Sequence, residues 1–89
     1  MTDDPRVAPH PDAILRRVGT GAVLVHLGSG HVYELNDSAA RAWELAAEGR
    51  TASEVAGALE SEYSGAPAEI RRDVHELFAF LADHGLLAP

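Results

Sequence analysis

The sequence predicts a small α+β domain in which a three-stranded antiparallel sheet is followed by three helices. Three observations support this fold class. Short runs rich in Val, Leu and Ile occupy the first part of the chain, and glycine-rich triplets separate these runs. From about residue 36 onward the apolar residues instead recur with the helical period. Because a chain of 89 residues buries enough surface for only one core, we expect a single domain.

The three apolar runs predict a β-meander. The strands are expected at Ala13–Val18, Ala22–Leu27 and His31–Leu35, with turns at Gly19–Gly21 and Gly28–Gly30. Glycine reaches positive φ without steric cost, so both triplets are typical of tight turns between antiparallel strands. Residues 1–12 contain three prolines and three aspartates. They are therefore expected to form a flexible arm that precedes a domain over residues 13–89.

Two registers are open for the second hairpin. A three-residue loop would place Leu27 opposite His31 and Val25 opposite Tyr33, whereas a two-residue loop would place Val25 opposite Glu34. We expect the three-residue loop, because it collects most of the large apolar side chains on one face of the sheet.

Capping residues mark the first two helices. Asn36 and Ser38 offer N-cap oxygens for a helix over residues 38–48, and Gly49 ends it. Thr51 and Glu54 have the spacing of a capping box, which opens a second helix through about Tyr63.

The third helix is the longest. Pro67 suits a first helical turn, the helix extends to about His84, and Gly85 fits a left-handed C-cap. Its apolar stripe follows the helical period closely and comprises Ile70, Val74, Leu77, Phe78 and Leu81.

The composition excludes several classes of protein. The chain has 14 acidic residues, seven arginines, no lysine and no cysteine, for a net charge of −7. Without cysteine it has no disulfide, thiolate zinc site or iron–sulfur cluster. The acidic balance disfavours nucleic-acid binding, which depends on cationic side chains. No apolar run is long enough to cross a membrane, and the first residues do not resemble a secretory signal, so we expect a cytoplasmic protein.

No pattern of residues indicates catalysis, a cofactor or a metal. The histidines contain no i, i+4 pair and no H-E-x-x-H motif. Gly28–Gly30 lacks the following helix of a phosphate-binding loop and the pattern of a nucleophile elbow. The expectation is therefore a protein that is not an enzyme and that needs no cofactor or metal.

The last predicted strand has an undefended edge. The strand His31–Leu35 contains no proline or lysine and only one formal charge, so its outer backbone groups are open to pairing. If the third helix lies near this edge, Val74 and Phe78 would form an apolar wall beside it. An extended peptide added as a further strand would fit such a groove.

The order and spacing of several segments resemble the PqqD family, also called the RiPP recognition element. The similarity covers about residues 13–87. The segments that carry it are Val23–Asn36, Ala39–Leu45 with its Trp-Glu-Leu stretch, Thr51–Ala56, Glu62-Tyr63, Asp73-Val74 and Gly85–Leu87.

The resemblance implies a winged-helix-like fold without catalytic activity. Such proteins bind the leader segment of a ribosomally made precursor peptide as a strand beside their third strand, against the third helix. They present the precursor to a partner: a radical S-adenosylmethionine (SAM) enzyme, a cyclodehydratase or, in lasso peptide pathways, a leader peptidase. Carried onto this chain, the expected peptide-binding residues are His31, Val32, Tyr33, Glu34 and Leu35 on the strand and Arg71, Val74, His75 and Phe78 on the helix. Arg71 and its neighbour Arg72 are expected to meet acidic leader residues.

Two alternatives remain open at this point. The helices over residues 52–63 and 67–84 are placed like a helix-turn-helix, so a winged-helix DNA-binding module is one alternative. A structural dimerisation domain is the other. An exposed strand edge can also pair with its own copy, which leaves both a monomer and a homodimer possible.

Overall fold

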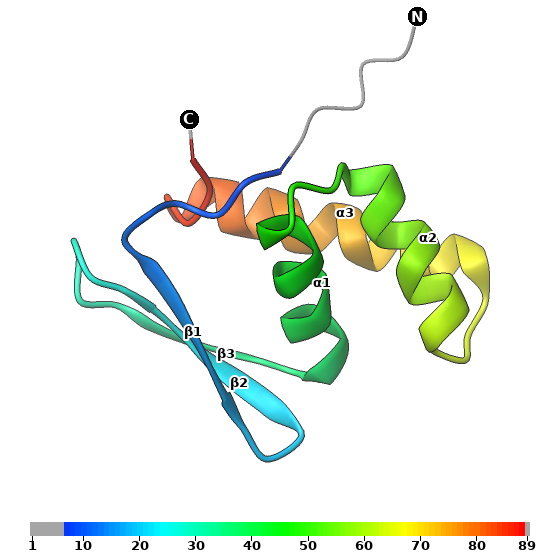
Figure 1. Cartoon of the computed structure of the whole chain (residues 1–89), viewed down its shortest axis with the longest axis horizontal. Helices are drawn as coiled ribbons and strands as arrows, with labels where there is room; N and C mark the ends of the chain where they lie inside the picture. The colour runs from blue at the N-terminus through cyan, green and yellow to red at the C-terminus, as the bar shows by residue number, and fades with distance from the viewer. Residues whose placement is uncertain (1–6, 89) are drawn as a thin grey trace, which may run out of the picture.

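The computed structural model describes residues 7–88 and confirms the predicted fold class (Figure 1). Its elements are β1 (Ala13–Val18), β2 (Gly21–His26), β3 (Val32–Leu35), α1 (Asp37–Ala47), α2 (Ala52–Glu62) and α3 (Pro67–Asp83). The strands form one antiparallel sheet in the order β1-β2-β3. In Figure 1 the sheet lies on one side of α1 and α2 lies on the other, while the long α3 runs behind α1.

The first hairpin forms at the predicted position, but Gly21 belongs to β2 and not to the turn. Val18 pairs with Gly21, so Gly19 and Thr20 make a two-residue turn. Gly19 has a φ of 59°, which a residue with a Cβ rarely adopts. The glycine therefore fixes both the turn and the register of β1 against β2.

The register of the second hairpin differs from both predicted registers. His26 donates its N–H to the His31 carbonyl at 3.0 Å, and Val25 pairs with Val32, so the loop contains four residues, 27–30. The Gly30 N–H closes this loop on the His26 carbonyl at 2.7 Å, and Gly30 has a φ of 76°. Leu27 leaves the strand because its own N–H donates instead to the carbonyl of Asp12.

This register reverses the face that β2 turns to the core. Ala22 and Leu24 are buried, whereas Val23 and Val25 lie on the outer face of the sheet. Both faces of β2 are apolar in sequence, so the pattern of residues did not distinguish them. The outer face also carries Ile14 and Val32, which are 41% and 60% exposed.

The helix caps agree with the predictions. The Asn36 side chain accepts from the Ala39 N–H at 2.9 Å and begins α1. The capping box of α2 is present in both directions, because Thr51 and Glu54 each bond the other's backbone N–H. Gly85 ends α3 with a φ of 71°.

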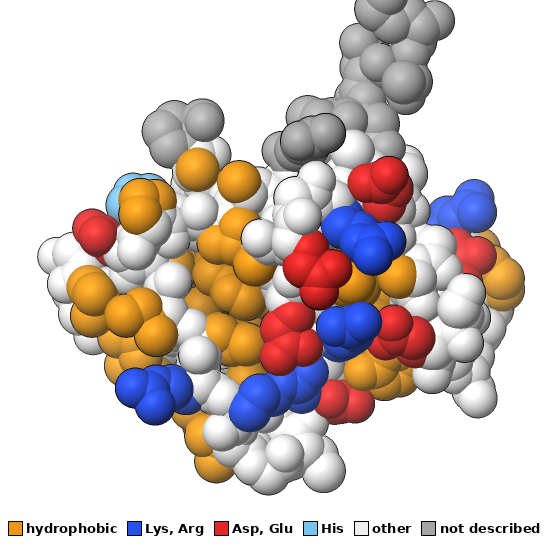
Figure 2. Space-filling view, viewed as in Figure 1, with side chains coloured by type: hydrophobic (Ala, Val, Ile, Leu, Met, Phe, Trp, Pro, Cys, Tyr) orange, Lys and Arg blue, Asp and Glu red, His pale blue; other side chains and the backbone are white. Residues whose placement is uncertain are grey.

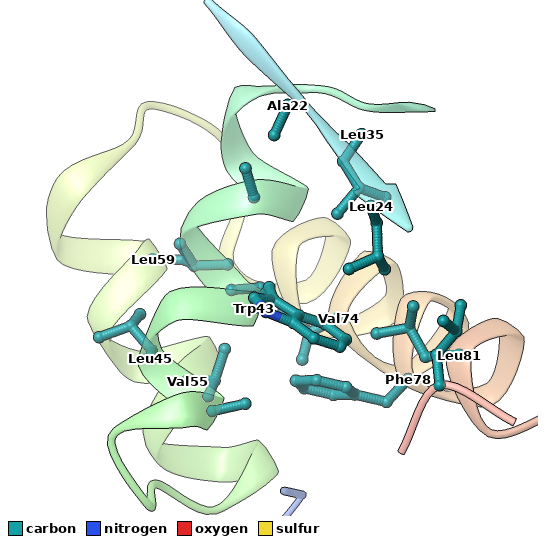
Figure 3. Packing of buried hydrophobic residues seen from close by; sticks show 14 of the residues in the cluster. Ala22, Leu24, Leu35, Trp43, Leu45, Val55, Leu59, Val74, Phe78 and Leu81 are labelled. Atoms are coloured by element: carbon teal, nitrogen blue, oxygen red, sulfur yellow. The ribbon is translucent and has the colours of Figure 1, made fainter. Parts of the chain in front are cut away.

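A single core joins the sheet to all three helices. Figure 3 shows Trp43 of α1 beside Val74 and Phe78 of α3, with Leu24 coming from the sheet. The largest fully buried side chains are Leu24, Leu45, Val55, Leu81 and Leu86. Because these side chains come from β2, α1, α2, α3 and the segment after α3, the core holds every layer of the fold in place.

The described part of the predicted N-terminal arm contacts the C-terminal segment. Residues 1–6 lie outside the described residues. Beyond them, Pro9 bridges to Leu87, the His10 N–H donates to the Leu86 carbonyl, and the Ala88 N–H donates to the Ala8 carbonyl. Residues 8–10 therefore pair with the C-terminal segment.

Gly21 allows β2 to approach the end of β3. A Cβ placed on Gly21 would lie 2.6 Å from the Leu35 carbonyl oxygen, which is too close for two non-bonded atoms. We expect Gly21→Ala to lower the free energy of unfolding by about 1–3 kcal/mol, because the end of β3 must shift. Urea denaturation measures this loss.

Gly57 in α2 provides a matched control, since a Cβ there would meet no atom within 4 Å. Gly57→Ala is expected to raise the free energy of unfolding by about 0.5–1 kcal/mol, because alanine favours the helix. If Gly21→Ala were as stable as the wild type, the close approach of these two strands would be wrong.

Candidate functional site

The outer edge of β3 is the first component of the site. The His26–His31 pair is hydrogen-bonded, and bonded and non-bonded pairs alternate along antiparallel strands. Tyr33 is therefore the next residue of β3 to bond to β2, whereas Val32 and Glu34 direct their N–H and carbonyl groups away from the sheet. Since β3 is the last strand of the sheet, these groups have no strand partner among residues 7–88.

A hollow of about 670 Å³ lies beside this edge. Its residues come from the end of β3, the start of α1, the end of α2 and one side of α3. They are Glu34, Leu35, Asn36, Ser38, Ala39, Ala42, Leu59, Tyr63, Ser64, Ile70, Asp73, Val74, Glu76, Leu77 and Phe80. We call this hollow, together with the β3 edge, the edge groove.

The helical residues predicted from sequence lie mostly elsewhere. Val74 lines the edge groove, but Phe78 is only 7% exposed and belongs to the core. Arg71 and His75 line a different hollow, of about 400 Å³, between α2 and α3. There the Arg71 Nε donates to Glu60 at 2.9 Å.

The strand residues are divided by the alternation of β3. Leu35 is buried in the core, and Tyr33 lies partly buried on the same face of the sheet. Val32 and Glu34 are exposed on the opposite face, and their backbone groups form the free edge. His31 precedes β3 and is bonded to β2 through its carbonyl, so it adds nothing to that edge.

An aromatic cluster closes one end of the space between β3 and α3. The ring centroid of Tyr33 lies 5.7 Å from that of Phe80 and 5.5 Å from that of His84, both in edge-on geometry. The Phe80 and His84 rings are 4.1 Å apart. The C-terminal end of α3 therefore contacts β3, and the edge groove lies beside the preceding turns of this helix.

Phe80, Asp73 and Glu76 line the groove but were not predicted from the sequence, and Ile70 and Leu77 were expected in the core stripe. The sequence did contain an indication of a second apolar face on α3. Phe80 is a large aromatic residue outside the main apolar stripe of α3, and it is 38% exposed. Together with Ile70 and Leu77 it forms a second apolar stripe at the helical spacing.

A network of ion pairs holds the groove's α1 end in place. Arg17 of β1 donates to Asp37 at 2.7 Å and to both oxygens of Glu44, at 3.0 and 3.1 Å. Arg41 makes a similar two-point contact with Glu62 of α2. Figure 2 shows basic and acidic side chains interspersed over α1 and toward α2.

These contacts shift the pKa values of the acidic partners. Hydrogen bonds from Arg17 lower the pKa of Asp37 and of Glu44, and those from Arg41 lower the pKa of Glu62. Asp37 also accepts from the hydroxyl of Tyr63 at 2.9 Å. Loss of water contact, followed by this hydrogen bond, raises the pKa of Tyr63. Tyr63 lines the edge groove, so the network positions one of its walls.

The structure provides no metal centre within residues 7–88, because no group of three or more His, Asp or Glu side chains is arranged to hold an ion there. His26 has a structural contact instead. Its Nδ1 accepts from the Ser29 N–H, so Nε2 carries the proton and donates to the Gly85 carbonyl at 3.1 Å. Among these residues no helix is long and apolar enough to span a membrane.

The fold and the site define a class: a three-stranded sheet with three helices, and an open strand edge beside an apolar groove. The family model described as coenzyme PQQ synthesis protein D (PqqD) matches residues 21–87. The chain therefore belongs to the PqqD family, as its sequence pattern indicated. No curated protein matches the chain at a significant level.

Two solved structures have the same fold. One is TbiB1 in complex with the TbiA(β) leader peptide, with a TM-score of 0.81 and 28% identity over 90% of this chain and 93% of that chain. The other is lasso peptide synthetase B1 complexed with the leader peptide. It has a TM-score of 0.82 and 28% identity over 96% of this chain and 100% of that chain.

The lowered pKa values of the network carboxylates predict a dependence of stability on pH. A carboxylate whose pKa is lower when folded stabilises the protein above its unfolded pKa, about 4, and loses this effect as the pH falls through the folded value. We expect the free energy of unfolding to be highest above about pH 5 and to decline below about pH 4. Urea denaturation at a series of pH values measures this.

Asp37→Asn isolates one part of that dependence. The variant lacks the titrating group, so it should be less stable than the wild type near neutral pH and lose less stability on acidification. Equal acid-induced losses in the two proteins would show that Asp37 does not contribute to the pH dependence.

Proposed function

We propose that this chain is a non-catalytic adaptor that binds the leader segment of a ribosomally made precursor peptide as a fourth strand beside β3. The observation that carries the proposal is the free edge of β3 next to an apolar hollow on α3. Membership of the PqqD family and similarity to two leader-peptide complexes support the same function.

The geometry supplies both parts of peptide recognition. The outward backbone groups of Val32 and Glu34 provide hydrogen bonds to any extended chain. Ile70, Leu77 and Phe80 provide apolar surface for side chains on the helix-facing side of that chain. The backbone contacts contribute affinity, and the side-chain contacts determine which peptide is bound.

The adaptor would deliver its peptide to a separate enzyme. A radical SAM enzyme, a cyclodehydratase and a leader peptidase are the partners implied by the family resemblance. Similarity to a lasso peptide synthetase B1 favours the leader peptidase, which acts in lasso peptide pathways. A winged-helix DNA-binding role has no support from the comparisons, and the exposed side of α3 carries Glu69, Asp73, Glu76 and Asp83.

The binding experiment starts from a random peptide library displayed on phage and selected on the immobilised full chain. An enriched peptide is then synthesised with a fluorescent label, and its affinity is measured by anisotropy. Because strand addition protects backbone amides, the amide hydrogens of Val32 and Glu34 should exchange more slowly when the peptide is bound.

We expect Val32→Pro to weaken binding of the selected peptide by about tenfold or more, because proline removes an outward N–H that would bond to the added strand. The fold should persist, since the bonds between β2 and β3 do not use this amide. Val32→Ala, which shortens the side chain but retains the N–H, is the comparison and should bind more tightly than Val32→Pro. Equal affinities for these two variants would contradict strand addition at this edge.

Alanine substitutions of the two phenylalanines of α3 distinguish an effect on peptide binding from an effect on stability. Phe80→Ala should weaken peptide binding by about 3- to 10-fold with a small loss of stability, because Phe80 lines the groove and is partly exposed. Phe78→Ala should lower the free energy of unfolding by about 3–5 kcal/mol, because Phe78 is in the core. Titration and urea denaturation of both variants measure these effects, and the reverse pattern would contradict the position of the groove.

A further inference from the structure

Among residues 7–88, the charged residues that line the edge groove are all acidic. They are Glu34, Asp73 and Glu76, and no arginine or histidine of this part of the chain contributes to the lining. None of these three carboxylates has an ion pair or a side-chain hydrogen bond among residues 7–88. The groove is therefore both apolar and negatively charged.

Most of the described arginines are paired away from the groove. Arg17, Arg41, Arg50 and Arg71 each form an ion pair with a carboxylate outside the lining. In particular, Arg71 is held by Glu60 beside the hollow between α2 and α3. Of the two arginines that were expected to meet acidic leader residues, Arg71 is thus on another side of α3, and Arg72 is exposed but does not line the edge groove.

The acidic side chains of α3 lie next to its apolar stripe. Asp73 and Glu76 are exposed and three residues apart, and Ile70 and Leu77 lie at helical spacing beside them. Glu34 lies across the groove on β3, although its side chain points to the outer face of the sheet. A peptide strand between β3 and α3 would thus place its helix-facing side chains among apolar groups with carboxylates at the rim.

We infer that the edge groove selects leader segments in which apolar side chains are accompanied by lysine or arginine. This inference rests on the proposed function and specifies the peptide that the same groove takes. A cationic side chain has a long apolar stem and a charged end, so it covers the apolar stripe and reaches Asp73 or Glu76. An acidic leader segment would meet uncompensated negative charge and is disfavoured.

The spacing of the groove also limits the peptide. Ile70 and Leu77 are seven residues apart on α3, or about 10 Å at 1.5 Å per residue. An extended strand advances about 3.3 Å per residue and directs every second side chain to the same face. Two or three alternate residues of the peptide therefore face this part of the helix. In the expected motif, the apolar and cationic residues occupy every second position, on the face that is turned to α3.

The test uses a random peptide library with equal coding for acidic and basic residues, selected in parallel on the wild-type chain and on Val32→Pro. Peptides recovered from the wild type and lost with Val32→Pro are those bound at the β3 edge. We expect this set to be enriched in lysine and arginine that are separated from an apolar residue by one position. An edge-dependent set with no cationic excess would overturn the inference and leave strand addition intact.

Variants of the rim then test the charge directly. Against one enriched peptide, Asp73→Asn/Glu76→Gln should bind about 3- to 10-fold more weakly than the wild type, in keeping with exposed ion pairs. The affinity of the wild type should fall with added salt, and that of the variant should change less. The control Asp12→Asn/Glu48→Gln also removes two negative charges, but from outside the groove lining.

A charge exchange completes the experiment. Asp73→Lys/Glu76→Lys should bind the enriched peptide poorly and should prefer a version in which its lysines are replaced by glutamate. If the two peptide versions bound equally to this variant and to the wild type, the rim charges would play no part in selection. If instead Val32→Pro retained every enriched peptide, the proposed function would fail regardless of their charge.

Discussion

The rest of the structure depends on the way α3 divides its apolar residues between two faces. Val74, Phe78 and Leu81 are buried in the core, and α3 packs against α2 and α1. This packing fixes the position of the helix. Its second stripe, which includes Ile70, Leu77 and Phe80, is then left beside the edge of β3. A helix with one apolar face would leave no such surface beside the sheet.

The sheet contributes the second half of the groove because it stops at three strands. Val32 and Glu34 have outward backbone groups, and no fourth strand within the described part of the chain bonds to them. The aromatic contact of Tyr33 with Phe80 and His84 holds the strand at a set position relative to the helix. The free edge and the apolar stripe are therefore fixed with respect to each other before any peptide binds, which lowers the entropic cost of binding.

The distribution of charge follows from the same arrangement. Arg17 and Arg41 join β1, α1 and α2 through their ion pairs with Asp37, Glu44 and Glu62. The hydrogen bond between Asp37 and Tyr63 connects this network to one wall of the groove. Among residues 7–88, the carboxylates that line the groove form no ion pair. Part of the net charge of −7 therefore lies at the site.

The sequence alone determined the order, approximate bounds and caps of the elements, because turns, N-caps and helical periodicity depend on residues close together in the chain. Gly19, the Thr51–Glu54 capping box and Gly85 all act within a few residues. It also indicated the family and the open edge of the last strand. The register of β2 against β3 was decided only in the tertiary structure, because both faces of β2 are apolar and Leu24 is buried by helices distant in sequence. The same holds for α3, whose two apolar stripes are similar in composition. Packing against Trp43 selects which stripe enters the core and which one lines the groove.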